Sequence, residues 1–283
     1  AQDHGLHHPD PAVTPAPSWL AAARLAVQQP PLRVRWPLWV AGQVVGSVEP
    51  HVFNEIGLQR IVDERYVLSN QEFKGAPAWV LDTPPDGTTA ALNALADALR
   101  ARGVCGPWRN EQLRVLNRAG EPVGTIERGA VRVLGLATQA VHLVGHTGDG
   151  HLWVQQRAFN KPNNPGQWDT LMGGMVSAAD TLQQALTRET WEEAGLQVHT
   201  LQTVAHGGHL DVARPADEAG GAGYMVERID WFHATVPDGM VPVNQDGEVA
   251  RFELLPPGEV HRRLAQGAFT PEAALVLAAY FGW

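Results

Sequence analysis

Three glutamates cluster near the end of one predicted helix, in the segment GMVSAADTLQQALTRETWEEAGL (174–196). The pattern predicts a helix that is capped by Asp180 and stopped by the glycine close to the end of the segment. At 100° per residue, Glu189, Glu192 and Glu193 share one stripe about 120° wide with apolar residues of the preceding turns. The three carboxylates are therefore expected to point the same way, beside the protein core.

This arrangement is unfavourable without a counter-charge. Glu189 and Glu193 are a like-charge i,i+4 pair, which costs about 0.2–0.5 kcal/mol, and acidic groups at a helix C-terminus oppose the helix dipole. Burial adds several kcal/mol for each uncompensated charge, of which the neighbouring Arg188 offsets only part. A divalent cation resolves the conflict, and oxygen ligands without His or Cys favour Mg²⁺ or Mn²⁺ over zinc. The alternative is a solvated acidic helix end.

The same segment resembles the Nudix box, G-x5-E-x7-R-E-U-x-E-E-x-G-U, in which U is a bulky aliphatic residue. Asp180 stands where the family has Glu, which keeps the charge but shortens its reach, and Thr190 stands at the first aliphatic position. A motif of this length in a loop-helix-loop context is highly specific. The residues that match the pattern are Gly174, Arg188, Glu189, Glu192, Glu193, Gly195 and Leu196.

The resemblance implies a Nudix fold, a mixed α/β sandwich with a sheet between helices, and metal-assisted hydrolysis of a diphosphate joined to an organic group. It assigns Glu189, Glu192 and Glu193 to Mg²⁺ (or Mn²⁺). Glu189 is alternatively the group that takes the proton of the attacking water, with Arg188 orienting it. Glu248 is expected to be a further metal ligand or the general base, because three carboxylates leave coordination positions open. The alternative for Glu248 is a surface residue in a polar turn.

Two cations lie in LWVQQRAFNKPNNPGQWDTLMGG (152–174), which resembles a Nudix subgroup shared by isopentenyl diphosphate isomerase and a set of two-domain hydrolases. Arg157 is expected to meet phosphate oxygens through a bidentate fork and Lys161 as a point charge. A solvated strand end and loop is the alternative for both. Gly173 and Gly174 are expected to line the substrate site. Gly173 stands where the isomerase has its cysteine, so isomerisation is not expected.

The two-domain hydrolases offer the fuller resemblance, and their plant and fungal members act on thiamine diphosphate and its oxo and oxy forms. Hydrolysis of such a compound to the monophosphate and phosphate is the leading prediction. The alternatives are a general nucleoside-diphosphate-X hydrolase and a sensor that binds a nucleotide without cleaving it. Trp108 and Arg109 are expected to offer the organic group a stacking face and a fixed cation, with packing and a salt bridge as the alternative. The motifs that carry this resemblance are WRNE (108–111), IER (126–128), DGEVARFEL (246–254) and GAFTPEAALV (267–276).

The patterning divides the chain into a loose tail (1–16), a smaller α+β module (17–130) and a Nudix domain (131–283). No Gly/Ser-rich or Pro-rich spacer separates the two modules, so they are expected to pack directly and leave a cleft. Apolar periodicity and turn signals predict the individual elements. The expected helices are 19–27, 89–102, 180–194, 259–266 and 271–280, and the expected strands are a hairpin at 34–48 and segments 114–116, 122–126, 138–145, 151–157, 197–205, 225–233 and 249–255.

Composition excludes several classes of protein. The chain has 283 residues, 44% of them hydrophobic and 18% charged, which excludes global disorder. Thirty acidic against 21 basic residues give a charge of −9, so nucleic acid is not an expected partner. No apolar run reaches the roughly 20 residues of a membrane span, and no signal-peptide pattern is visible, so a cytoplasmic location is expected. The expected partner is a small-molecule diphosphate, and a homodimer is left open.

Overall fold

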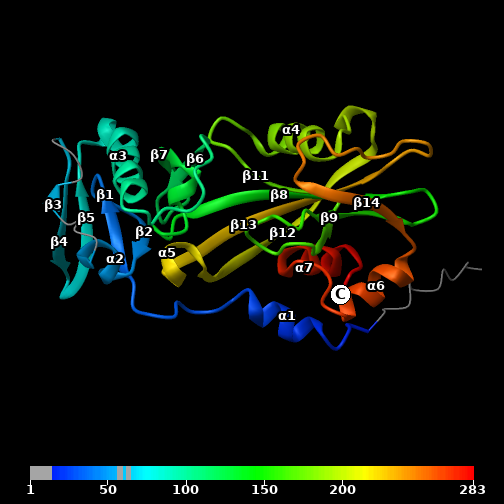
Figure 1. The fold of residues 1–283 in the computed structure, drawn as a ribbon, viewed down its shortest axis with the longest axis horizontal. Helices are drawn as coiled ribbons and strands as arrows, with labels where there is room; N and C mark the ends of the chain where they lie inside the picture. The colour runs from blue at the N-terminus through cyan, green and yellow to red at the C-terminus, as the bar shows by residue number, and fades with distance from the viewer. Residues whose placement is uncertain (1–14, 56–59, 62–64) are drawn as a thin grey trace, which may run out of the picture.

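The computed structural model describes residues 15–55, 60–61 and 65–283. The expected loose tail, 1–16, lies outside the described residues except for its last two positions. Two β-sheets follow one another along the long axis of the molecule, and helices lie on both sides of the larger one (Figure 1). Within the described ranges, no helix is long and apolar enough to cross a membrane.

The smaller sheet and its helices form the N-terminal end of the molecule. They are β1 (Trp36–Val40), β2 (Gln43–Val48), α2 (Pro50–Glu55), β3 (Arg60–Ile61), β4 (Val67–Phe73), β5 (Ala76–Asp82) and α3 (Thr88–Ala101). The sheet order is β2-β1-β5-β4-β3. The expected hairpin at 34–48 is confirmed as β1 and β2, with Ala41 and Gly42 at φ of +49° and +77° in the turn. The hairpin of β4 and β5 escaped the sequence-based prediction, although Lys74 and Gly75, both at positive φ, mark its turn.

A two-stranded antiparallel sheet connects the smaller sheet to the larger one. It consists of β6 (Gln112–Leu116) and β7 (Pro122–Glu127), which confirms the two short strands expected there. Helix α3 packs on β7, and its apolar face is buried as its period predicts, with Leu92, Leu95 and Leu99 fully buried. This connection places the loops on either side of β6 and β7 next to the second half of the chain.

The larger sheet is mixed, as the expected fold class requires. Its path is β10-β9-β8-β13-β12, with β11 paired to β8 and β14 to β9, and only β8 and β13 run parallel. Helix α4 covers one face and α1, α6 and α7 lie on the other, which makes an α/β/α sandwich (Figure 1). Its elements are α1 (Leu20–Ala26), β8 (Ala137–His146), β9 (Leu152–Arg157), β10 (Trp168–Thr170), β11 (Met172–Met175), α4 (Leu182–Ala194), β12 (Gln202–Ala216), α5 (Glu218–Gly221), β13 (Gly223–Thr235), β14 (Val249–Leu255), α6 (Pro257–Ala265) and α7 (Pro271–Tyr280).

One predicted strand was misplaced. The expected strand 197–205 begins only at residue 202, because residues 198–200 form a 3₁₀ turn, and it continues to residue 216. The extension follows from pairing with β13, which runs alongside β12 to its end. Sequence patterning misses it because the two faces of this long strand are mostly exposed or half-buried.

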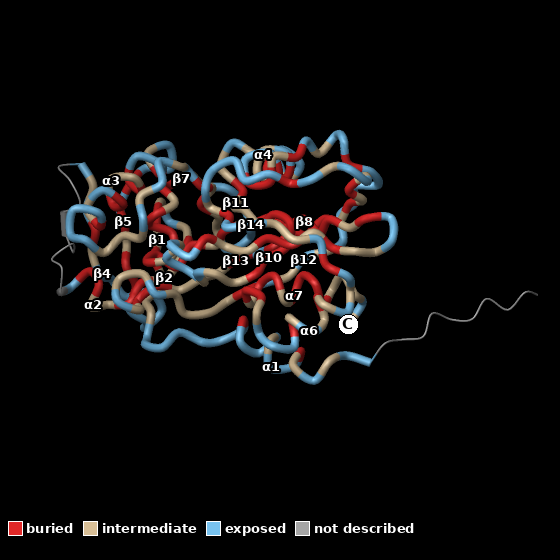
Figure 2. Tube along the Cα trace, turned by 45° about the vertical axis from the view of Figure 1, so that its right-hand side comes forward, coloured by how far each residue is buried: buried red, intermediate tan, exposed pale blue. Residues whose placement is uncertain are grey.

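Packing crosses the expected boundary between the two modules. Leu20 and Val27, near the two ends of the α1 segment, belong to the apolar core under the larger sheet, where α1 packs on α7. In the other direction, Val131, Val133 and Leu136 are buried in the core of the N-terminal module. Figure 2 shows buried segments in both halves of the molecule. The two halves therefore fold against each other rather than as beads on a linker.

Helix α1 offers a direct test of this packing. Leu20 is 1% exposed whereas Leu25 on the same helix is 65% exposed. We expect Leu20→Ala to lower the free energy of unfolding by about 2–5 kcal/mol, because it leaves a cavity against the larger sheet. Leu25→Ala, the control, should change it by less than about 0.5 kcal/mol. Urea denaturation of both variants measures this, and equal effects would contradict the packing of α1.

Candidate active site

Helix α4 begins at Leu182, two residues after the start of the expected range 180–194, and a different side chain caps it. The Thr181 side chain accepts a hydrogen bond from the backbone of Gln184, and the Gln184 side chain bonds the backbone N–H of Thr181 in return. The expected cap, Asp180, is wrong because its carboxylate is engaged elsewhere. The helix ends as expected at Gly195, which has a φ of +64°.

The guanidinium of Arg188 gathers the acidic groups at this end of the protein. It binds the carboxylate of Asp180 at 2.6 Å, that of Glu189 at 2.9 Å and that of Glu192 at 3.2 Å. It also donates to the hydroxyl of Ser177 at 3.2 Å. Asp180 therefore reaches the arginine despite its shorter side chain, so the substitution at this box position preserves the salt bridge.

For two carboxylates of α4, burial disfavours the charged form more than the neighbouring groups favour it. Burial raises the pKa of Glu189 from its ordinary 4.5 to about 7; Arg188 works against this shift, while Glu192 and Glu111 add to it. Burial also raises the pKa of Glu193 well above its usual range, although its carboxylate accepts hydrogen bonds from the Gln155 side chain and, at 3.3 Å, from the backbone N–H of Gly173. Both groups are therefore poised to bind either a proton or a metal cation.

The two glycines ahead of α4 leave room for functional side chains. A Cβ on Gly174 would lie 2.5 Å from the carboxyl carbon of Glu189, and a Cβ on Gly173 would lie 2.8 Å from the ring of His142. Neither clash can be relieved without moving a side chain that is at least half buried. Glycine is required here because it lets these side chains approach the backbone of β11.

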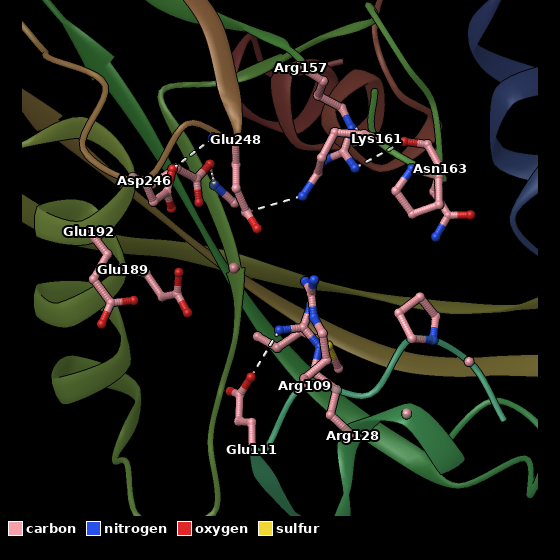
Figure 3. A pocket seen from close by; sticks show the side chains of 18 of the residues that line it. Arg109, Glu111, Arg128, Arg157, Lys161, Asn163, Glu189, Glu192, Asp246 and Glu248 are labelled. Carbon is pink, nitrogen blue, oxygen red and sulfur yellow. Dashed lines mark hydrogen bonds and ion pairs between the residues drawn. The ribbon is translucent and has the colours of Figure 1, made fainter. Parts of the chain in front are cut away.

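A cavity of about 530 Å³ opens between α4 and the N-terminal module. Figure 3 shows Glu189 and Glu192 on one side of it and Arg109 reaching toward its middle from the side of Arg128. All of the residues predicted for the site line this cavity. They are Trp108, Arg109, Arg157, Lys161, Gly173, Gly174, Arg188, Glu189, Glu192, Glu193 and Glu248.

Arg109 and Arg128 form a basic side of the cavity, and one buried carboxylate of the N-terminal module holds the backbone around them in place. Glu127 is 2% exposed and accepts backbone hydrogen bonds from Arg109 and Glu111, each at 3.1 Å, and from Gly129. Glu111 in turn binds Arg128 at 3.0 Å. Arg128 and Glu127 were not predicted, although the IER motif contains both. Their role depends on the loops that β6 and β7 bring together, which no local pattern reveals.

Lys161 and Glu248, both in the wall of the cavity, form an ion pair at 3.1 Å (Figure 3). Burial raises the pKa of Glu248, but the nearby Lys161, Arg109 and Arg128 outweigh burial and lower it. Arg157 donates to the backbone carbonyl of Asn163 at 3.0 and 3.2 Å. Arg109 and Arg128 of the N-terminal module therefore line the same cavity as Arg157 and Lys161 of the second half of the chain.

The donor set of the cavity fits a hard divalent cation. In the part of the chain that the structure describes, no three His, Cys, Asp or Glu side chains already converge on a metal position. Arg188 binds Glu189 and Glu192, and Lys161 binds Glu248. Glu193 keeps a carboxylate in a nearly dry position with neutral partners only. A divalent cation bound to these oxygens would take the place of the carboxyl protons and of the ion pairs with Arg188 and Lys161. Carboxylate oxygens are the ligands that Mg²⁺ and Mn²⁺ prefer.

Comparison with known proteins identifies the family. The NUDIX domain model matches residues 136–277, which is half of the chain, so the chain belongs to the Nudix family. It is 28% identical to Nudix hydrolase 24, chloroplastic, of Arabidopsis thaliana over 67% of this chain and 52% of that protein. It is 26% identical to the uncharacterized protein YJR142W of Saccharomyces cerevisiae over 62% of this chain and 54% of that protein. The chain thus spans about half the length of the curated relatives it matches.

Among solved structures, DR0079 from Deinococcus radiodurans superposes with a TM-score of 0.48 and 22% identity, over 60% of this chain and 99% of that one.

The match to the Arabidopsis protein covers more of the chain than residues 136–283 contain, so it includes part of the N-terminal module. The shared region therefore extends beyond the Nudix domain.

The raised pKa values predict how stability depends on pH and metal. In the absence of divalent cations, folded Glu189 holds a proton between pH 4.5 and about 7 that the unfolded chain has lost, so stability should fall as pH rises through this range. Mg²⁺ should raise the melting temperature more at pH 8 than at pH 5, because ligands must be deprotonated to bind it. Thermal denaturation with and without Mg²⁺ measures both effects.

Glu189→Gln should flatten this pH dependence and reduce the stabilisation by Mg²⁺ at pH 8. A variant that keeps the full Mg²⁺ effect would contradict the placement of Glu189 at the metal.

Proposed function

We propose that this protein is a Mg²⁺-dependent (or Mn²⁺-dependent) Nudix pyrophosphohydrolase that cleaves a diphosphate linked to an organic group. The observation that carries the proposal is that one cavity has carboxylates of α4 on one side and cations of both modules around the rest. A diphosphate needs both, because its negatively charged non-bridging oxygens would be neutralised by a metal ion together with arginine and lysine.

In the proposed reaction, Arg109, Arg157 and Lys161 bind phosphate oxygens and orient one phosphorus toward α4. Glu189, Glu192, Glu193 and Glu248 are the residues that would hold Mg²⁺, and the metal would supply charge neutralisation and make the attacking water more acidic. Glu189 either holds the metal or takes the proton of the attacking water, and a pKa raised by burial suits it to the second role. In both roles Arg188 positions its carboxylate. Attack on the phosphorus and departure of the bridging oxygen yield a monophosphate ester and phosphate.

The proposed substrate is thiamine diphosphate or one of its oxidised forms. Support comes from the motif resemblance over both modules and from the relatives, whose matches extend into the N-terminal module. Trp108, whose ring stacks under the Arg100 guanidinium at 4.3 Å, lies at the cavity wall, so the N-terminal module is proposed to bind part of the organic group. Isomerisation is not proposed, because Gly173 supplies no thiol.

A substrate screen tests this function. Phosphate release should be measured with Mg²⁺ on thiamine diphosphate, its oxo and oxy analogues, ADP-ribose, a nucleoside diphosphate sugar and isopentenyl diphosphate. We expect the thiamine compounds to have the highest kcat/KM, and isopentenyl diphosphate to yield no dimethylallyl diphosphate. Preference for ADP-ribose would replace the proposed substrate, and no release from any compound would reject the hydrolase.

Loss of one helix carboxylate should strongly reduce turnover without unfolding the protein. Glu192 is half exposed, with Arg188 as its ion-pair partner. Glu192→Gln should lower kcat by about two orders of magnitude or more, the scale of one lost electrostatic stabiliser. The melting temperature should hold or rise slightly, because relief of the repulsion between Glu192 and Glu189 offsets the lost ion pair. Glu259→Gln, an ion-paired glutamate on the far side of the sheet, is the matched control and should keep full turnover. Near-normal Mg²⁺-dependent activity in Glu192→Gln would refute the metal assignment.

The basic side of the cavity predicts an effect on KM. Arg109 is exposed to the cavity and its side chain has no ion-pair partner among the described residues. Arg109→Gln should raise KM by about tenfold or more, because it removes a charged hydrogen bond to phosphate. Arg118→Gln, on the exposed turn between β6 and β7, is the control. Steady-state kinetics on the best substrate of the screen would separate the two, and an unchanged KM for Arg109→Gln would remove this residue from the proposal.

The remaining assignments are predictions of the same proposal. The cations at the cavity alternate with carboxylates rather than forming a basic face, which suits a small anion and not nucleic acid. The cytoplasmic location and a homodimer stay predictions; the Arabidopsis relative carries the word chloroplastic in its name.

A further inference from the structure

Glu111 lies where the two modules meet, and the proposed reaction gives its carboxylate no role. Glu111 directly precedes β6 and Arg128 directly follows β7, so the pairing of these two strands brings the two residues side by side. The backbone N–H of Arg128 donates to the carbonyl of Glu111 at 2.8 Å, and the backbone N–H of Glu111 donates to the Glu127 carboxylate at 3.1 Å. The backbone therefore fixes the place of Glu111 in the cavity wall.

The carboxylate of Glu111 binds one partner with each oxygen. Oε2 pairs with a terminal nitrogen of Arg128 at 3.0 Å (Figure 3). Oε1 accepts a hydrogen bond from the Ser177 hydroxyl at 2.5 Å, and this hydroxyl accepts one from Nη2 of Arg188 at 3.2 Å. A continuous chain of hydrogen bonds therefore connects the guanidinium of Arg128 to that of Arg188.

The residue types set the direction of every bond in this chain. A guanidinium only donates and an ionised carboxylate only accepts, so the Ser177 hydroxyl must accept from Arg188 and donate to Glu111. The side chains of Arg128, Glu111 and Arg188 are 26%, 23% and 32% exposed, so water has limited access to the chain of bonds. Charged hydrogen bonds in such surroundings hold side chains more firmly than ion pairs on an open surface do.

Both ends of the chain of bonds lie in the wall of the cavity beside α4. Among the described residues, the side chain of Arg128 forms hydrogen bonds with Glu111 alone, which leaves its other N–H groups for a ligand. A guanidinium held in one orientation suits the bidentate recognition of a phosphate. At the opposite end, Arg188 binds the carboxylate of Glu189 at 2.9 Å, so a shift of Arg188 would displace that carboxylate.

We propose that Glu111 is a positioning residue of this hydrolase, which holds Arg128 directly for a phosphate of the substrate and holds Arg188 through Ser177. Through this one side chain, the N-terminal module controls both the binding of the diphosphate and the orientation of the Glu189 carboxylate. This role of Glu111 rests on the proposed function for the reaction, whereas the binding of a diphosphate by Arg128 can be measured without it.

Three variants separate the two ends of the chain of bonds. Arg128→Gln removes the end that faces the ligand, Ser177→Ala removes the link to Arg188, and Glu111→Ala removes both. Ser177→Thr keeps the hydroxyl and is the conservative variant. Glu121→Ala, an exposed glutamate at the opposite end of the same hairpin, is the matched control.

Steady-state kinetics on the best substrate of the screen should show a split between KM and kcat. We expect Arg128→Gln to raise KM by about tenfold with kcat nearly unchanged, because a charged hydrogen bond to phosphate is lost. Ser177→Ala should lower kcat by about tenfold with KM nearly unchanged, because the carboxylate of Glu189 is less well oriented. Glu111→Ala should show both effects, whereas Ser177→Thr and Glu121→Ala should match the wild type.

Calorimetry with Mg²⁺ and methylenediphosphonate, a diphosphate analogue that cannot be hydrolysed, measures binding without turnover. Arg128→Gln and Glu111→Ala should weaken this binding by about tenfold, and Ser177→Ala should leave it unchanged. Circular dichroism should show that every variant is folded. If Glu111→Ala unfolds, Arg128→Gln and Ser177→Ala still test the two ends separately.

A purely structural role would lower kcat alike in all three variants, because it reduces the folded fraction, and would leave KM unchanged. That pattern, or wild-type kcat, KM and affinity in the folded variants, would overturn the role of Glu111, while diphosphate cleavage by the wild type would still support the hydrolase. If the wild type cleaves no diphosphate, the hydrolase is rejected. Weaker binding of methylenediphosphonate in Glu111→Ala and Arg128→Gln would then support the positioning of Arg128 by Glu111, and unchanged binding would overturn it.

Discussion

The guanidinium of Arg188 holds the acidic end of α4 together. Its ion pairs with Asp180, Glu189 and Glu192 bring three carboxylates within 3.2 Å of one cation. One positive charge cannot neutralise all of them, and burial keeps water away from most of Asp180 and Glu189. Burial explains why the pKa of Glu189 rises despite its arginine partner, and the nearby carboxylates of Glu192 and Glu111 add to the rise. Arg188 therefore stabilises the acidic end of α4 but leaves it with a net negative charge.

The N-terminal module is part of this arrangement. Arg114 on β6 donates to the backbone carbonyls of Ala178, at 3.1 Å, and of Asp180, in the loop that leads into α4. Glu111 accepts a hydrogen bond from Ser177 in the same loop at 2.5 Å. These contacts fix the loop from outside the Nudix domain. They also hold Asp180 near Arg188, where its shorter side chain suffices.

The acidic half of the site could be predicted from sequence, whereas most of the basic half could not. The carboxylate stripe follows from helical period alone, because all its members lie within five residues. The capping residue was wrong by one position, since Asp180 has a distant competing partner and Thr181 does not. Arg109 was predicted through the WRNE motif, but Arg128 and the buried Glu127 depend on how β6 and β7 approach α4. Contacts between residues sixty positions apart leave no local pattern.

The fold shows the same division between local and tertiary information. The hairpin of β8 and β9 and the helices with clear apolar faces lie where patterning places them, although the hairpin of β4 and β5 escaped it. The extension of β12 and the docking of α1 on α7 follow from their neighbours, so neither could be predicted from sequence alone. The sequence thus identifies the chemistry, and the tertiary structure shows which cations meet it.

The central claim is that α4 holds buried carboxylates, partly protonated at neutral pH, for a divalent cation. The most direct measurement is calorimetric titration of the full chain with Mn²⁺ at pH 7 in buffers of different ionisation enthalpy. Saturable binding that releases protons is predicted, because Glu189 has a pKa of about 7 and Glu193 a pKa well above its usual range. Mn²⁺ binding without proton release, or no saturable binding, would contradict the account.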